Sequence, residues 1–210
     1  MVEYMNHMGT DDTVCDAARV SMDKAAILFT KEQNKRLLVY LAKNQHWSPF
    51  SHTSLQMRFE APIFVARQLA KHQVGFAWNE VSRRYVSSDP ICWYPEFFRM
   101  RPENIKQGSG LDPHPRTSMH KAAYSAVCHT ALKAYKQMVD DGICPEQARA
   151  VLPQSMMTQW IWTGSLYAWH RMYKLRIDTH AQAEVQIYAR KVANICRHNY
   201  PDAWSALEAS

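Results

Sequence analysis

Glycine is scarce in this sequence, and the scarcity limits the folds and cofactor sites that are available to it. Only 6 of its 210 residues are glycine, about 3% against an average of about 7%. Neither a G-x-G-x-x-G nor a G-x-x-x-x-G-K-[ST] pattern is present. The sequence therefore excludes a Rossmann dinucleotide fingerprint and a P-loop, and a bound nucleotide must have its phosphates held by side chains.

The length and composition predict one globular domain. A chain of 210 residues matches the usual size of a single domain, which we expect over residues 1–210. With 47% hydrophobic and 21% charged residues, it can bury a core. The longest apolar run has six residues, at 61–66, too few to span a membrane, and residues 1–10 lack a secretory pattern. We therefore expect a cytoplasmic protein without a membrane partner.

The net charge of +6 favours anionic partners, among which nucleic acid, phosphorylated metabolites and folates all qualify. No block of lysine or arginine exceeds two residues, which argues against a polybasic arm. The chain has five cysteines and ten histidines, but neither C-x-x-C nor H-E-x-x-H occurs. We expect no metal site, and reduced, buried thiols at Cys15, Cys92, Cys128, Cys144 and Cys196.

Periodicity predicts a mixed α/β fold that is dominated by helices. We expect helices over residues 11–20, 32–44, 62–72, 118–141, 145–152, 164–174 and 181–197, strands over 54–60 and 159–163, and a loop over 46–52. The last helix is expected to start at a capping box, Thr179 to Gln182. Residues 87–115 hold five prolines and two glycines, which is typical of a surface excursion or a lid within the domain.

Hydrogen-bond donors gather after the apolar start of the helix that is expected from Pro62. They are Arg67, Gln68, Lys71, His72 and Gln73, with Arg67/Lys71 and Gln68/His72 at i,i+4 spacing. Cations at a helix C-terminus can simply compensate the helix dipole. A second polar cluster at 77–85 follows without a proline or glycine, however, so that both segments together predict one binding wall.

Arg176 is the sharpest single candidate in the second half of the chain. It precedes the helix expected from 181, so its guanidinium and the helix N-terminus could converge on one anion, and a salt bridge to Asp178 is the alternative. For Arg149, the default interpretation is an arginine whose side chain is solvated. Trp160 and Trp162 fit a place in the core better than a stacking platform for a ligand. Ser82 lacks the G-x-S-x-G elbow of a hydrolase.

Six blocks, in order along the chain, resemble the flavin-dependent thymidylate synthases. After the Ala-Ala-Arg-Val-Ser of 17–21, they are His-Trp-Ser-Pro-Phe (46–50), Ala-Pro-Ile-Phe-Val-Ala-Arg-Gln (61–68), Asn-Glu-Val-Ser-Arg-Arg-Tyr (79–85), Ala-Arg-Ala-Val-Leu-Pro (148–153), Trp-Thr (162–163) and Leu-Arg-Ile-Asp-Thr-His-Ala-Gln (175–182). The resemblance implies a helix-rich α+β domain around a small, mainly antiparallel sheet, assembled as a homotetramer with sites between subunits.

The same resemblance implies reductive methylation of dUMP to dTMP, with FAD as cofactor, NADPH and 5,10-methylenetetrahydrofolate as co-substrates, and no enzyme nucleophile. Arg176 is the implied catalytic residue: it would bind the uracil edge, favour ionisation of N3 and so activate C5. The implied dUMP site consists of Gln68, Lys71, Glu80, Ser82, Arg83, Arg84, Arg149 and Arg176. The implied FAD site consists of Ser21, His46, Ser48, Lys71, His72, Gln73, Val74, Asn79, Glu80, Ser165, Tyr167 and Arg171.

The chain departs from the family pattern on the flavin side. The family signature opens Arg-His-Arg, whereas this chain has Lys71, His72 and Gln73. Lys71 replaces a planar guanidinium by the point charge of an ammonium group, and Gln73 removes a second positive charge. The loop that follows gains one residue. The Asn-x-Arg after Trp-Thr is replaced by Ser165 and Tyr167, and a later Asn by Arg171. The strength of FAD binding, the reductant and the transferred group are therefore open.

Two other functions stay open at this point. One is a diverged transferase acting on C5 of a pyrimidine nucleotide, for example by hydroxymethylation, in which water traps the methylene group. The other is a nucleic-acid-binding module that uses Arg83, Arg84 and the tryptophans, and whose binding would depend steeply on salt. No nucleic-acid partner is expected if the family resemblance holds.

Overall fold

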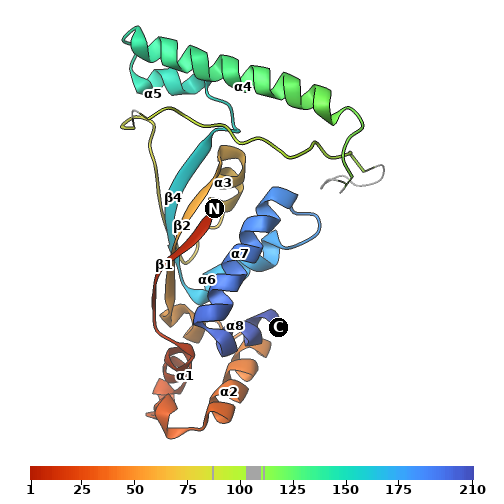
Figure 1. The fold of residues 1–210 in the computed structure, drawn as a ribbon. Coiled ribbons are helices and arrows are strands. Elements are labelled where there is room, and N and C mark those ends of the chain that lie inside the picture. Colours follow the sequence, from red (N-terminus) through yellow and green to blue (C-terminus); the bar gives the residue numbers. More distant parts are fainter. Residues whose placement is uncertain (87, 103–109, 111) are drawn as a thin grey trace.

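The computed structural model describes residues 1–86, 88–102, 110 and 112–210 (Figure 1). Short 3-10 turns lie at Val20–Met22, Ala26–Leu28, Pro49–His52 and Arg149–Val151. The strands and helices are β1 (Val2–Met8), α1 (Asp11–Arg19), α2 (Lys31–Lys43), β2 (Ser54–Pro62), α3 (Ile63–Leu69), β3 (Phe76–Glu80), α4 (Thr117–Asp140), α5 (Pro145–Ala148), β4 (Met157–Gly164), α6 (Leu166–Arg176), α7 (Ala183–Asn199) and α8 (Pro201–Glu208).

The strands form one antiparallel sheet in the order β1-β2-β4-β3. In the central strand β2, Leu55, Met57 and Phe59 are fully buried and alternate with polar residues, because successive side chains of a strand point to opposite faces. Met57 pairs with Trp162 of β4, which sets the register of the two central strands. The expected helix-rich α/β class with a small antiparallel sheet is confirmed.

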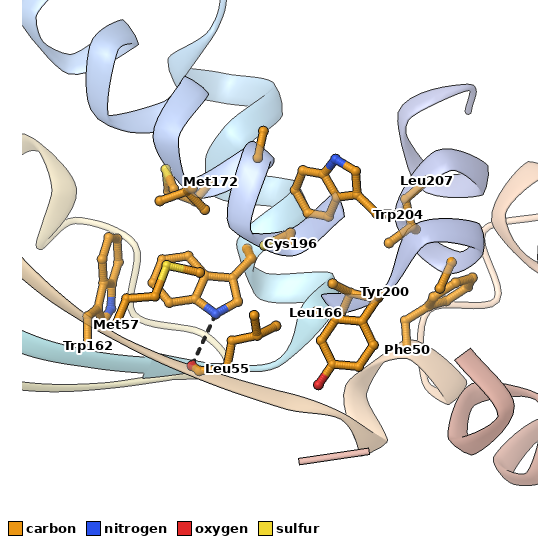
Figure 2. Packing of buried hydrophobic residues seen from close by; sticks show 14 of the residues in the cluster. Phe50, Leu55, Met57, Trp162, Leu166, Met172, Cys196, Tyr200, Trp204 and Leu207 are labelled. Atoms are coloured by element: carbon orange, nitrogen blue, oxygen red, sulfur yellow. Dashed lines mark hydrogen bonds between the residues drawn. The ribbon is translucent and has the colours of Figure 1, made fainter. Parts of the chain in front are cut away.

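The core lies between one face of this sheet and the helices α6 and α7 (Figures 1 and 2). Trp160 and Trp162 are 1% and 0% exposed, so their expected place in the core is confirmed. The Trp160 ring stacks on Phe59, with ring centroids 5.0 Å apart. The Trp169 indole of α6 donates a hydrogen bond to the Leu55 carbonyl over 3.3 Å, the dashed line in Figure 2. This contact anchors α6 on β2.

The remaining helices lie at the two ends of the sheet (Figure 1). Helices α1, α2 and α8 gather at one end, and α4 and α5 lie together at the other. The Tyr200 hydroxyl ties α7 to the sheet, because it donates toward the Met8 carbonyl at 2.7 Å and lies 3.1 Å from the Ser54 carbonyl. The helices expected over 11–20, 32–44 and 118–141 are confirmed within about one residue at each end.

Three elements have no counterpart in the sequence-based expectation. Strand β1 lies at the sheet edge, is mostly exposed and has a bulge between Tyr4 and Asn6, so it lacks the alternation that marks a strand. Strand β3 covers only five residues, of which all but Phe76 lie in the polar segment 77–85 of the expected binding wall. Helix α8 is a short helix that opens on Pro201 directly after α7.

The expected helix from Pro62 is shorter at both ends. Pro62 ends β2 and forms the N-cap of α3, and α3 ends at Leu69. Lys71, His72 and Gln73 therefore lie in the loop beyond the helix, and the expected i,i+4 pairs are wrong. In addition, the expected strand over 159–163 is extended at both ends, the expected loop over 46–52 contains the 3-10 turn Pro49–His52, and the segment expected as a helix over 145–152 consists of α5 and the following turn.

The expected capping box at Thr179 is also wrong, because α7 begins one residue after Gln182. The Asp178 carboxylate accepts a hydrogen bond from the backbone N–H of His180 over 2.7 Å, and its carbonyl accepts one from Ala181 over 2.9 Å. These local bonds hold residues 178–182 in turns, since an Asp side chain competes with helix formation.

The described part of the expected excursion, 87–115, contains neither a helix nor a strand. It runs along α4 (Figure 1), where the Tyr124 hydroxyl donates to the Trp93 carbonyl over 2.6 Å. Residues 87, 103–109 and 111 of this stretch lie outside the described residues. Among the described helices, none has the length and apolar character needed to cross a membrane.

Candidate active site

The side chain of Arg176, the last residue of α6, is held by the loop and helix that follow β2. Its Nε donates a hydrogen bond to Nε2 of His72 over 2.9 Å, and its Nη2 donates to the Gln68 carbonyl over 3.0 Å. The Gln68 side chain in turn donates to Oε1 of Gln182, the N-cap residue of α7. The structure therefore joins Gln68, His72 and Arg176, which are up to 108 residues apart, in one cluster.

The expected relation of Arg176 to its neighbours is partly wrong. Arg176 ends α6 and precedes α7, as expected, although α7 begins two residues later than expected. The alternative, a salt bridge to Asp178, is wrong, because the Asp178 carboxylate pairs with Nδ1 of His180 at 2.9 Å. Gln182 links the cluster to the start of α7, a link that the spacing of the sequence did not reveal.

His72 is a neutral hydrogen-bond acceptor in this cluster. Burial, and then the charges of Arg176 and Arg171, lower the pKa of His72 from 6.5 to about 4. Because Nε2 accepts from Arg176, the ring proton must be on Nδ1. Burial also lowers the pKa of Arg176, which still stays charged at neutral pH. The cluster thus presents a half-buried, fixed positive charge.

The other candidate residues for dUMP binding lie elsewhere in the chain. Glu80, at the end of β3, accepts hydrogen bonds from Thr158 over 2.7 Å and from Trp78 over 3.3 Å. In the loop after β3, Arg84 donates to the Ser82 hydroxyl over 3.3 Å, and Arg83 donates to the carbonyl of Ser88, within the same loop.

Arg149 and Lys71 lie on the surface. Arg149 is exposed in the 3-10 turn after α5 and donates to the Glu146 carbonyl over 3.3 Å. Lys71 is exposed in the loop between α3 and β3. Arg83 lines its own cavity of about 350 Å³, and Arg84 lines another of about 200 Å³. Within one chain, the candidate dUMP residues thus do not form a single hydrogen-bonded group. Some belong to the Arg176 cluster, and the others form separate local hydrogen bonds or lie on the surface.

A cavity of about 820 Å³, hereafter the main cavity, lies where β4 passes into α6. This volume falls within the usual range for ligand pockets. Its wall combines Trp47, Phe76 and Tyr167 with the hydroxyls of Ser51, Ser54 and Ser165 and with the guanidinium of Arg171. Aromatic surface with a few polar groups and a cation suits a flat, anionic ligand such as a nucleotide.

Two glycines shape this wall. A Cβ on Gly164 would lie 2.3 Å from the ring of Phe76, so only glycine lets this ring pack against the end of β4. Gly75 has φ +80°, and a Cβ there would lie 2.9 Å from that of Ala168 at the start of α6. The backbone at Gly75 therefore approaches α6 closely at this wall. These features fit a flavin in the main cavity.

The structure gathers some of the candidate flavin residues around this space. Val74, Ser165, Tyr167 and Arg171 line the main cavity, and His46 lines a smaller hollow that adjoins it. Ser165 is also the N-cap of α6, where its hydroxyl accepts from the N–H of Ala168 over 3.2 Å. The three residues that differ from the family pattern at 165, 167 and 171 therefore all lie in the cavity wall.

The remaining flavin candidates lie outside the cavity lining. Ser21 is exposed in the 3-10 turn after α1, and Ser48 is exposed just before Pro49. Gln73 is exposed beside Val74, and Asn79 is exposed on β3. The sequence analysis missed Trp47, which is 55% exposed and lines both hollows. A tryptophan in a polar segment that ends at a proline was the signal that could have found it.

The cysteines do not supply a nucleophile to this site. Cys15, Cys92, Cys128 and Cys196 are buried and free, as expected, whereas the expected burial of Cys144 is wrong. Burial raises the pKa of Cys15 and of Cys92 to about 11, which keeps both thiols protonated. Among the described residues, no group of three or more His, Cys, Asp or Glu side chains could hold a metal ion.

Comparisons with known proteins agree along nearly the whole chain. The family model Thy1, described as thymidylate synthase complementing protein, matches residues 2–202. A flavin-dependent thymidylate synthase of Thermosipho africanus is 34% identical over 207 residues, which cover 98% of this chain and 90% of that protein. One of Kosmotoga olearia is 36% identical over 207 residues, which cover 98% and 89%.

A solved structure is similar over the full length of the chain. It is described as a UMP/dUMP methylase, PolB, from Streptomyces cacaoi, bound with 5-Br dUMP. The TM-score is 0.89 at 26% sequence identity, and the match covers 100% of this chain and 94% of that chain. A second structure of the same methylase, bound with 5-Br UMP, has a TM-score of 0.86 at 25% identity, covering 100% and 93%.

Proposed function

This chain belongs to the family of flavin-dependent thymidylate synthases, and on that premise we propose that it methylates dUMP reductively to dTMP. It is thus a methyltransferase that uses FAD, with NADPH and 5,10-methylenetetrahydrofolate as co-substrates. The observation that carries the proposal is the Arg176 cluster beside the main cavity. Arg171 lines that cavity, and its charge also lowers the pKa of His72, so the two regions adjoin.

Arg176 is the proposed catalytic residue. Two of its nitrogens are held by His72 and Gln68, while its Nη1 has no protein hydrogen bond within the described residues. A fixed, half-buried guanidinium of this kind can donate to the edge of a uracil ring and stabilise negative charge at N3 and its neighbouring carbonyl oxygens. That charge increases electron density at C5, where the new carbon–carbon bond forms. The protein needs no nucleophile for this activation.

FAD is proposed to occupy the main cavity. Val74, Ser165, Tyr167 and Arg171 would hold it there, with the aromatic side chains packing on its ring system and the guanidinium balancing its charge. When bound, FAD supplies the hydride that completes the methyl group. The residues of the cavity orient this cofactor and exclude water from its reactive face. Lys71 and Gln73 are exposed and do not line the cavity, and they are proposed to contribute less.

Glu80, Ser82, Arg83 and Arg84 are proposed to complete the dUMP site of a neighbouring subunit, together with Arg149. Within one chain, the hydrogen bonds of these residues are separate from those of the Arg176 cluster. A homotetramer, which the family resemblance implies, would supply them from another copy. We also propose that the enzyme works in the cytoplasm. Light scattering coupled to size-exclusion chromatography tests the tetramer.

The first experiment is the visible absorption spectrum of the purified protein, alone and after addition of FAD and desalting. We expect a retained flavin band that bleaches with NADPH and responds to dUMP. Absence of flavin under every condition would overturn the flavin-dependent mechanism and would leave a diverged transferase.

The second experiment identifies the product. With dUMP, 5,10-methylenetetrahydrofolate and flavin reduced in D2O, where the exchangeable N5 hydrogen of the flavin is deuterium, we expect deuterium in the product methyl group. A hydroxymethyl product without deuterium would support the diverged transferase instead. UMP is the matched comparison substrate, because the similar solved structure is described as a UMP/dUMP methylase.

A further inference from the structure

A second hollow, hereafter the basic pocket, adjoins the main cavity. Its volume is about 210 Å³, and it shares Trp47, Tyr167 and Arg171 with the main cavity. Lys43 and Lys174, which do not line the main cavity, also line this pocket, in the last turn of α2 and near the end of α6. A ligand in the main cavity could therefore extend past the two aromatic rings into a pocket lined by cations.

The cations of the basic pocket converge because of helical spacing. Tyr167, Arg171 and Lys174 lie at i, i+4 and i+7 along α6, which places them on one face of the helix. Lys43 approaches from α2, so the charges come from two different elements. Within the described residues, none of these three cations forms an ion pair, whereas Lys35 of α2 pairs with Asp202 at 3.2 Å.

One carboxylate near the pocket, that of Glu208, is already engaged. Glu208 lines the neighbouring hollow together with His170 and Lys174. Its two carboxylate oxygens accept hydrogen bonds from Arg197 over 2.8 and 3.1 Å, which draws the negative charge toward Arg197. His170 is buried in the wall, and its pKa is lowered to about 4 by burial and by Lys174, so it adds no charge at neutral pH. The charged side chains that line the pocket, Lys43, Arg171 and Lys174, are all cations.

Two aromatic rings, the exposed Trp47 and the half-buried Tyr167, line both hollows. The indole of Trp47 is 55% exposed, and its ring centroid lies 6.2 Å from that of Tyr167. An exposed tryptophan at a cavity mouth favours contact with a flat ligand ring. Aromatic surface followed by free cations matches a molecule with an aromatic body and an anionic tail.

We propose that the basic pocket binds the carboxylate tail of the folate co-substrate, with Lys43, Arg171 and Lys174 as its cationic groups. This inference rests on the proposed function, from which the folate comes. Each glutamate added to a folate tail adds one negative charge, so several converging cations favour longer tails. A nucleotide phosphate shares the anionic chemistry but has a fixed charge, and it offers no such dependence on tail length.

Binding calorimetry with the full-length protein and saturating FAD tests the proposal without turnover. The probes are folic acid and its triglutamate. We expect the triglutamate to bind the wild type about tenfold more tightly, since two partly screened charge pairs contribute on this order. The double variant Lys43→Gln/Lys174→Gln is expected to bind both probes within about twofold of each other. High salt should reduce the preference of the wild type.

Lys31→Gln is the matched control, because Lys31 begins the same helix α2 that Lys43 ends and is equally exposed. This variant should keep the tenfold preference. Equal binding of the two probes by the wild type would overturn the proposal, as would a preference that survives in the double variant. If the double variant weakened only NADPH or FAD binding, the pocket would bind a nucleotide phosphate and the proposal would be wrong.

The proposed function can fail independently of this inference. Absence of dTMP formation with an intact tail-length preference would overturn the function and leave a folate-binding pocket. Thermal unfolding of each variant shows that it is folded, and the exposed positions of both lysines predict wild-type stability.

Discussion

The Nε of Arg176 donates a hydrogen bond to Nε2 of His72 over 2.9 Å, and this bond joins the end of α6 to the loop after α3. This bond sets the state of both side chains: the imidazole of His72 must be neutral with its proton on Nδ1, and the guanidinium of Arg176 loses the freedom to rotate. Because the Gln68 carbonyl holds a second nitrogen of Arg176, the orientation of the charge is set before a substrate binds. Preorganised charge of this kind lowers the barrier of a reaction in which negative charge develops.

Substitution of Arg176 by alanine should reduce the activity far more than the stability of the protein. We expect dTMP formation to fall by about 100-fold, as for the loss of one preorganised donor, while the melting temperature falls by only a few degrees. Arg190→Ala is the control, since Arg190 is an exposed arginine that donates a hydrogen bond to Gln186 of its own helix over 3.3 Å. Steady-state assays and thermal unfolding measure both quantities. Normal turnover of dUMP by Arg176→Ala would contradict the role.

His72 should act as a positioning residue through its acceptor atom. His72→Leu removes the acceptor, and we expect kcat to fall by about tenfold, the effect of losing one hydrogen bond to a charged group. His72→Gln offers a side-chain oxygen and should restore most of this loss. If both variants had equal activity, the hydrogen bond to Arg176 would not position the guanidinium.

Acidification should destabilise the protein below about pH 6.5. The pKa of His72 and of His170 falls to about 4 in the folded state, from 6.5, with burial as the main cause for both. The unfolded chain therefore binds more protons between pH 4 and 6.5, and stability falls as the pH falls through this window. Because His72 is only half-buried, we discount the shifts for solvent screening and expect a loss on the order of 2 kcal/mol from both.

Urea unfolding between pH 7.5 and pH 5 measures this loss. Asp11 acts in the opposite direction, because burial raises the pKa of its carboxyl and protonation then favours the folded state. His170→Gln should reduce the slope of stability against pH. An unchanged slope in this variant would mean that His170 does not titrate on unfolding.

Gly75→Ala should weaken flavin retention. The new methyl group would lie 2.9 Å from that of Ala168, so the loop or the start of α6 must shift at the wall of the main cavity. Gly142→Ala is the matched control: Gly142 has a similar φ of +87°, but nothing lies within 4 Å of the added Cβ. Both variants carry the same backbone strain of about 1 kcal/mol. The flavin absorption band after desalting should fall in Gly75→Ala and persist in Gly142→Ala.

Local patterns in the sequence were sufficient for the elements that bury one regular face. The alternation of Leu55, Met57 and Phe59 predicted β2, and the leucines of residues 32–44 predicted α2. Six ordered blocks predicted the family, and the scarcity of glycine excluded the common nucleotide-binding folds. These properties depend on residues close in the chain, where propensity and periodicity act directly.

The tertiary structure decided what depends on distant partners. Strand β1 forms because β2 offers its edge, and α7 starts late because Asp178 captures the preceding N–H groups. The environment of Arg176 comes from Gln68 and His72, more than 100 residues away, and no local pattern can encode a contact at such separation. The sequence by itself therefore determined the class of fold, the family and the identity of the charged groups. Only packing brought Arg176 together with His72 and Gln68 in one cluster, because buried polar groups must find hydrogen-bond partners wherever they lie in the chain.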